Sequence, residues 1–300
     1  MKHWIGHVFV TLGLAPWSAT TVSYSDEPTP VFDGNCRHAA LTYLTSPTAR
    51  EAVDKLETEP ALKITRELAR FAHFLRVDFA RQKLTLLSEA DQKRCASEAL
   101  KLADQIGNAF TTRARELVTA GKITAFYEET LVWKTTISEN QESALFEKAW
   151  VELEPLYLQA LLKGLFKHLE KTPWDSWRYL DIALASWSGE WKTLLGFEAP
   201  AAVHFEERRI ALKPLLYRPL ELQLFLFHEL SHLADPKLKT APRTTSERFE
   251  NEVFAWRETI AFVEWLETQK KIAPPDLFAT VRKAAHDNGL ENWVRLVLGY

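Results

Sequence analysis

The sequence predicts a mainly α-helical protein (an α+β fold) that also contains a small β-sheet in its C-terminal third. Apolar residues recur at helical spacing through most of residues 34–195, a pattern typical of packed helices. Between residues 201 and 213, alternating and β-branched residues surround a charged turn, which indicates one or two short strands. The 300 residues are 46% hydrophobic and 12% aromatic, enough for a sizeable core in one large domain or two modest ones.

Residues 1–25 are expected to form a cleaved signal peptide. A weakly basic start is followed at 4–15 by a mostly apolar stretch, long enough for a signal peptide and too short to cross a bilayer. Small residues at 18–25 allow cleavage there, and a buried N-terminal helix is the alternative. Residues 26–33 contain two prolines and are expected to form an extended leader. The mature chain is therefore expected to be periplasmic or secreted, with no transmembrane span.

The charge balance gives no reason to expect a nucleic-acid partner. The formal net charge is -3, the isoelectric point is near 6.3, and the chain has no long basic run. The charged residues are therefore interpreted as ordinary solvated surface. No feature of the sequence indicates an oligomeric state.

The chain contains two cysteines, Cys36 and Cys95, each near the start of a predicted helical segment. Neither lies in a Cys/His cluster of the kind that binds a metal ion. A single disulfide is the natural hypothesis for an exported protein, and two buried thiols are the alternative.

Helices are expected throughout the first region, residues 34–195. Ser46 and Pro47 supply an N-cap and a first-turn proline for one of them. The predicted helices span residues 48–56, 62–86, 88–120, 140–169 and 174–187. Aromatic residues gather near the end of this region: Trp174, Trp177, Tyr179, Trp187 and Trp191. They are expected to be core residues, and a platform for sugar rings is the alternative.

The second region, residues 196–300, is expected to carry the functional site. Residues 220–234 are nearly all apolar, but His228, Glu229 and His232 interrupt the run. The proline that follows Asp235 ends the predicted helix. Such an apolar helix must be largely buried, and burying two histidines and a glutamate is unfavourable unless something binds or pairs with them.

The spacing of these three residues indicates a metal site. Histidines at positions i and i+4 lie one turn apart on the same face of a helix, so His228 and His232 can reach one ion. Glu229 then lies on the flank where a coordinated water would sit. Zinc is the simplest ion for this pattern, and we expect one Zn²⁺ per chain.

The order of these elements resembles the gluzincin metallopeptidases, over roughly residues 203–266. A strand precedes the His-Glu-Leu-Ser-His helix, and the string Asn-Glu-Val-Phe-Ala at 251–255 follows it. The resemblance implies a zinc metallopeptidase, a hydrolase that acts on a peptide or protein substrate. It also implies that Glu252 is the third zinc ligand and Glu229 the general base, and that residues 209–213 form the edge strand along which a peptide adds.

Helical periodicity also places Glu252 toward the core. Thr244 and Glu247 form a capping-box start for a helix that is expected to reach about residue 268. Glu252 shares one face of this helix with several apolar residues, whereas Glu258 lies about 120° away. Glu258 is therefore the rival ligand and a candidate for an outer contact that orients a ligand. Asp235, on the ligand face of the preceding helix, is a second such candidate or a solvated helix end.

Two function classes follow from these observations. The first is hydrolysis of peptide bonds by a metal-activated water with Glu229 as general base. The second is a non-catalytic binding or scaffold protein with a zincin fold and a structural zinc. The presence of Glu229 favours the hydrolase, because a structural zinc site needs no general base. The group that stabilises the oxyanion is not identified, and Arg257, His286 and Tyr300 are the polar candidates downstream.

Overall fold

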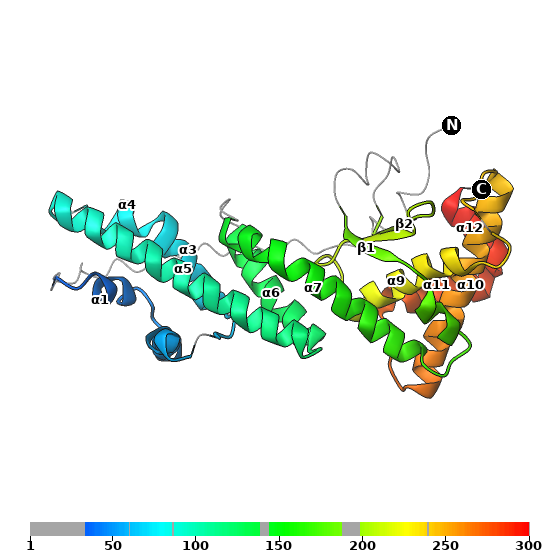
Figure 1. Ribbon diagram of the computed structural model, residues 1–300, viewed down its shortest axis with the longest axis horizontal. Coiled ribbons are helices and arrows are strands. Elements are labelled where there is room, and N and C mark those ends of the chain that lie inside the picture. The colour runs from blue at the N-terminus through cyan, green and yellow to red at the C-terminus, as the bar shows by residue number, and fades with distance from the viewer. Residues whose placement is uncertain are drawn as a thin grey trace. The chain divides into compact units, whose positions relative to one another are not determined.

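The computed structural model of the protein describes residues 34–59, 61–85, 87–138, 144–187, 199–238 and 240–299. These residues form two compact units, 34–156 and 157–299 (Figure 1). Helices dominate the described residues, and a mixed three-stranded sheet lies in the second unit, so the predicted fold class is confirmed. The predicted signal peptide (1–25) and leader (26–33) lie outside the described residues. None of the described helices combines the length and apolar character that crossing a membrane requires.

Helices of the first unit begin where the sequence supplies capping side chains. In four of them a side chain accepts a hydrogen bond from a first-turn N–H, and these caps are Asn35, Ser46, Thr65 and Ser88. The elements are α1 (Cys36–Leu41), α2 (Pro47–Asp54), the 3₁₀ helix η1 (Lys55–Glu57), α3 (Arg66–Val77), α4 (Phe79–Lys83), α5 (Glu89–Thr119), α6 (Ile123–Ser138) and α7 (Ala144–Leu169). The helix predicted for 62–86 begins only at Arg66 and is divided into α3 and α4, whereas the one predicted for 88–120 forms as α5.

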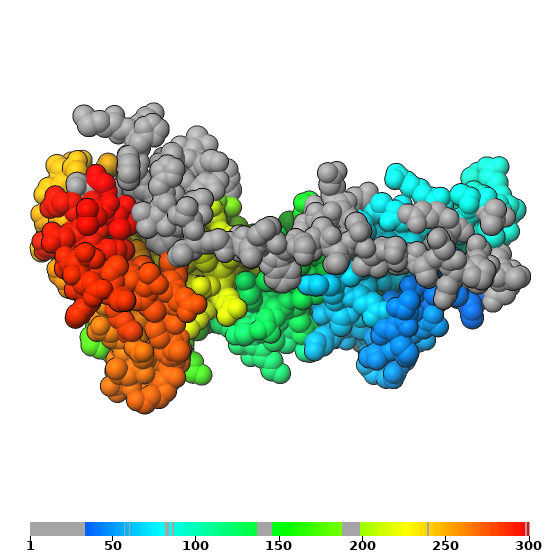
Figure 2. Space-filling model, turned by 180° about the vertical axis from the view of Figure 1, so that it is seen from behind, coloured from blue at the N-terminus to red at the C-terminus, as the bar shows by residue number. Residues whose placement is uncertain are grey.

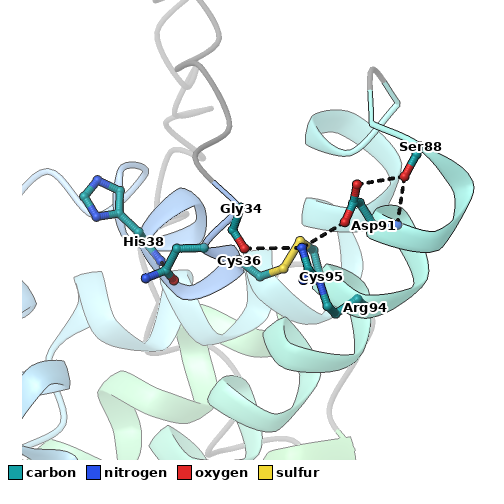
Figure 3. The surroundings of a disulfide bond; sticks show 8 residues. Gly34, Cys36, His38, Ser88, Asp91, Arg94 and Cys95 are labelled. Atoms are coloured by element: carbon teal, nitrogen blue, oxygen red, sulfur yellow. Dashed lines mark hydrogen bonds and ion pairs between the residues drawn. A yellow bond between two sulfur atoms is a disulfide. The ribbon is translucent and has the colours of Figure 1, made fainter.

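A disulfide joins α1 to α5. Cys36 and Cys95 are bonded, and both are buried (Figure 3). Beside the bridge, the guanidinium of Arg94 donates hydrogen bonds to the carbonyl of Gly34 and the carboxylate of Asp91. The sequence left a disulfide and two buried thiols as alternatives, and the disulfide is the one that forms. Its cysteines are 59 residues apart, and closing a loop of that length gives an ideal chain-entropy stabilisation of about 4 kcal/mol.

The second unit combines the sheet with helices that pack around it. Its elements are the end of α7, the 3₁₀ helix η2 (Asp175–Tyr179), the strands β1 (Ala183–Ser186), β2 (Ala201–His204) and β3 (Arg209–Leu212), and the helices α9 (Pro219–Ala234), α10 (Thr245–Gln269), α11 (Asp276–Asn288) and α12 (Leu290–Leu298). In the sheet, β3 runs parallel to β1 and antiparallel to β2. Figure 2 shows residues of the C-terminal helices, coloured orange to red, packed closely against one another.

Two sequence predictions about this sheet are wrong. The helix predicted for 174–187 does not form, because residues 183–186 pair with β3 as strand β1. Local propensity does not reveal such a distant partner. The strand predicted to be the edge, 209–213, corresponds to β3 and lies between the other two. The outer strands of the described sheet are β1 and β2.

Helix α9 is the buried centre of the second unit. Every residue from 222 to 232 is at most 9% exposed. The helix packs against α10 and against strands β2 and β3. Trp174 and Trp177 contact the ring of Phe227 on α9, so these two tryptophans belong to the core, whereas Tyr179 is 78% exposed. Trp191 lies outside the described residues.

Candidate metal site

The two histidines of α9 face one point in the interior. His228 and His232 are 7% and 6% exposed, and their Nε2 atoms lie 3.2 Å apart. The i and i+4 spacing places both rings on the same side of the helix, as the sequence predicts. The ring of Trp256 packs on His228 with centroids 4.3 Å apart, and Phe205 lies 6.4 Å from the ring of His232. Aromatic side chains therefore flank both imidazoles.

Glu252, on α10, lies beside these two histidines. This helix begins with the predicted capping box, in which Thr244 and Glu247 each satisfy a backbone N–H of the other. One carboxylate oxygen of Glu252, Oε2, lies 3.8 Å from Nε2 of His228 and 3.9 Å from Nε2 of His232. Atoms that bind one tetrahedral zinc ion at 2.0–2.1 Å are about 3.4 Å from one another. The distances between these three atoms, 3.2, 3.8 and 3.9 Å, are therefore close to those that one bound zinc ion requires.

Hydrogen bonds at the far side of each ring fix which ring nitrogen is free. Nδ1 of His232 lies 2.6 Å from Oδ1 of Asn251. The amide nitrogen of Asn251 donates to the carboxylate of Asp235 (3.1 Å) and to the carbonyl of His232 (3.3 Å), which sets the orientation of the amide. Oδ1 can only accept, so Nδ1 of His232 is the protonated nitrogen.

His228 is held in the same way. Its Nδ1 lies 3.2 Å from the hydroxyl of Thr259, and that hydroxyl donates its proton to the carbonyl of Ala255 at 2.7 Å. The oxygen of Thr259 therefore accepts from Nδ1. In neutral histidines with this tautomer, both Nε2 atoms carry lone pairs. The two Nε2 atoms lie 3.2 Å apart, so they are satisfied either by one proton shared in an N–H···N hydrogen bond or by a metal ion bound to both.

Glu229 adds a buried carboxylate beside the histidines. Its carboxylate lies within 4.8 Å of a ring nitrogen of each, and the three residues form a group that could hold a metal ion. The side chain is 9% exposed, and burial raises its pKa to about 7. The nearby His232 and the backbone N–H of Val203 on β2 lower this pKa, and the carboxylate of Glu252 raises it.

The electrostatics of the remaining two groups follow the same pattern. Burial, followed by the neighbouring His232, holds the pKa of His228 well below its usual value. Burial raises the pKa of Glu252. The protein thus disfavours the charged form of each group, and a divalent cation among them would favour the deprotonated carboxylates and the neutral imidazoles. These observations fit a metal ion at this position.

The other residues predicted for the site do not contact the two histidines directly. The carboxylate of Asp235 holds the amide of Asn251, so it contacts the histidines only through that residue. Glu258 accepts a hydrogen bond from the indole of Trp174 at 2.7 Å. The side chain of His286 is 89% exposed, and Arg257 is exposed on α10. Tyr300 lies outside the described residues.

Sequence reasoning did not find Asn251 and Thr259. Asn251 directly precedes the predicted ligand Glu252, and Thr259 lies two turns further along the same helix. Both are fully buried polar residues, and a buried polar side chain in a helix that packs on the metal helix indicates such a partner once the packing is known.

Comparison of the chain with protein-family models, with curated proteins and with solved structures finds no match.

Proposed function

We propose that the protein is a zinc-dependent peptidase of the gluzincin type that acts outside the cytoplasm. The observation that carries the proposal is the convergence of two Nε2 lone pairs and a Glu252 carboxylate oxygen on one point, with Glu229 beside them. Two imidazoles and a carboxylate, with a fourth position open, are the ligand set of catalytic zinc sites. The fold class and the buried α9 agree with this proposal.

Each residue has a distinct role in the proposed reaction. His228, His232 and Glu252 hold the ion. Zinc at this position would supply Lewis-acid chemistry, lowering the pKa of a coordinated water and polarising a peptide carbonyl. Glu229 accepts the proton of the attacking water and returns it to the leaving amine. Asn251 and Thr259 keep the imidazoles in the tautomer that presents Nε2.

The substrate is proposed to bind along β2 rather than along the strand that the sequence indicated. β2 is an outer strand of the described sheet and packs against α9. The backbone N–H of Val203 in β2 is close enough to the carboxylate of Glu229 to lower its pKa. An extended peptide that adds to this strand by backbone hydrogen bonds would run past the general base.

An extracytoplasmic location is part of the proposal. It is supported by the Cys36–Cys95 disulfide, because disulfides persist in oxidising compartments. N-terminal sequencing of the mature protein from its host tests it. A start between Thr20 and Asp26 supports export, and an intact Met1 contradicts it.

The test of the activity separates metal binding from hydrolysis. Glu229→Gln should retain zinc and lose cleavage of a peptide library, because the amide is nearly the same shape and cannot accept the proton. His228→Ala should lose both, and Glu206→Gln, which alters an exposed carboxylate of the same unit, should change neither. A structural zinc site predicts instead that the wild type cleaves no peptide. Full activity of Glu229→Gln, or loss of zinc as complete as in His228→Ala, would overturn the assigned role.

A further inference from the structure

A cavity lies in the same unit, among the three C-terminal helices. It has a volume of about 380 Å³, and its walls come from α10, α11 and the start of α12, which pack on one another. The lining residues are Arg257, Ile260, Glu264, Arg282, Lys283, Ala285, His286 and Leu290. None of the four residues of the metal site is among them, so this is a separate site. Its volume is within the range of about 300–1,000 Å³ that is typical of small-molecule sites.

The cavity has an apolar part. Ile260, Ala285 and Leu290 contribute hydrocarbon surface from three different helices. Ala285 is 5% exposed, and Ile260 and Leu290 are partly buried. Apolar surface of this kind binds the hydrocarbon part of a ligand because water is released from both.

The charged part of the lining is mostly cationic. Arg257, Arg282 and Lys283 carry positive charge, and Glu264 is the one acidic residue of the lining. Arg282 is already paired with Glu267 on α10. Within the described part of the chain, Arg257 and Lys283 have no ion-pair partner. Two unpaired cations beside an apolar surface are complementary to a ligand with an apolar body and a single anionic group.

We propose that the cavity between α10, α11 and α12 binds an apolar ligand that carries one carboxylate. Arg257 and Lys283 would contact the carboxylate, and Ile260 and Leu290 would contact the hydrocarbon. A fatty acid of medium chain length and the C-terminal end of an apolar peptide share this chemistry. Glu264 would oppose binding, because its charge has the same sign as that of the ligand.

Calorimetric titration of the full chain tests this proposal with two ligands and their uncharged amides. The ligands are octanoate and N-acetyl-leucyl-leucine. Either should bind, and its amide should bind much more weakly or not at all, because the amide lacks the charge. Tighter binding of octanoate assigns the site to fatty acids, and tighter binding of the dipeptide assigns it to peptide ends. Binding should weaken as salt is added, since the cations are near the surface.

Charge variants give the sharper test because their effects have opposite signs. Arg257→Gln and Lys283→Gln should each weaken binding by about two- to fivefold, the range for exposed ion pairs. Glu264→Gln should strengthen it by a similar factor. Arg248→Gln, which removes an exposed cation from the same helix outside the lining, should leave it unchanged. The proposal is overturned if neither carboxylate binds, if the amides bind equally well, or if Arg248→Gln weakens binding as much as Lys283→Gln.

Discussion

Replacing Asn251 by leucine should damage the candidate metal site without removing any predicted ligand. The side chain is 3% exposed and makes three contacts: to Nδ1 of His232 at 2.6 Å, to Asp235 at 3.1 Å and to the carbonyl of His232 at 3.3 Å. Leucine is similar in size but leaves these buried groups without a partner. Each such loss costs about 1–3 kcal/mol. Asp235 keeps its hydrogen bond from the N–H of Lys237, so we expect a total of about 3 kcal/mol in the metal-free protein.

The same substitution should lower zinc affinity. Without Asn251, Nδ1 of His232 no longer has the acceptor that holds its proton there and orients the ring. Loss of such an outer contact typically weakens metal binding by about 10- to 100-fold, which corresponds to roughly 1.4–2.7 kcal/mol. Competition with a fluorescent chelator measures the affinity, and denaturant unfolding of the chelated protein measures stability.

A matched control is available on α12. Asn292→Leu replaces an exposed asparagine whose amide, within the described residues, donates only to the carbonyl of Asn288. It should leave zinc affinity unchanged and alter the unfolding free energy by less than about 0.5 kcal/mol. If Asn251→Leu binds zinc as tightly as Asn292→Leu, Asn251 does not orient His232 for metal binding.

Three further predictions test other parts of the account. Glu252→Ala should lower zinc affinity by orders of magnitude. Glu258→Ala should mainly lower stability, because Trp174 loses its hydrogen-bond acceptor. If chelator competition gives the reverse order of zinc affinities, the third ligand is Glu258. In the metal-free protein, the raised pKa of Glu229 means that the folded state keeps a proton that the unfolded chain loses. The unfolding free energy of the wild type, minus that of Glu229→Gln, should therefore fall by about 3 kcal/mol as pH rises from about 4.5 to 7. A flat difference in urea titrations across that window would refute this. Cys95→Ser should destabilise unit 34–156 by about 2–4 kcal/mol in denaturant while zinc binding persists, and unchanged stability would show that the bridge contributes nothing.

Local sequence patterns predicted those parts of the molecule whose chemistry lies within one helix. The spacing of His228 and His232 is a property of a single helix, so their common face follows from the sequence. The capping box of Thr244 and Glu247 is likewise local and marks the start of α10, and helical periodicity places Glu252 on the apolar face of that helix.

The remaining features depend on contacts between distant segments. Residues 183–186, with the sequence Ala-Leu-Ala-Ser, have good helix propensity, yet they form β1 because β3 offers backbone partners. The partners of the histidines, Asn251 and Thr259, depend on how α10 packs against α9. A single sequence shows neither the sheet order nor that packing, so neither was predictable.

Zinc binding by the purified protein is the most direct test of the central claim that His228, His232 and Glu252 form a metal site. The measurement is metal content after equilibrium dialysis against zinc and removal of free ion, for the wild type and for His228→Ala. We expect one tightly held Zn²⁺ per wild-type chain and none in the variant. His228→Ala would leave only two protein ligands and two positions for water, which greatly lowers the affinity for zinc. Equal zinc content in the two proteins, or none in either, would contradict the account.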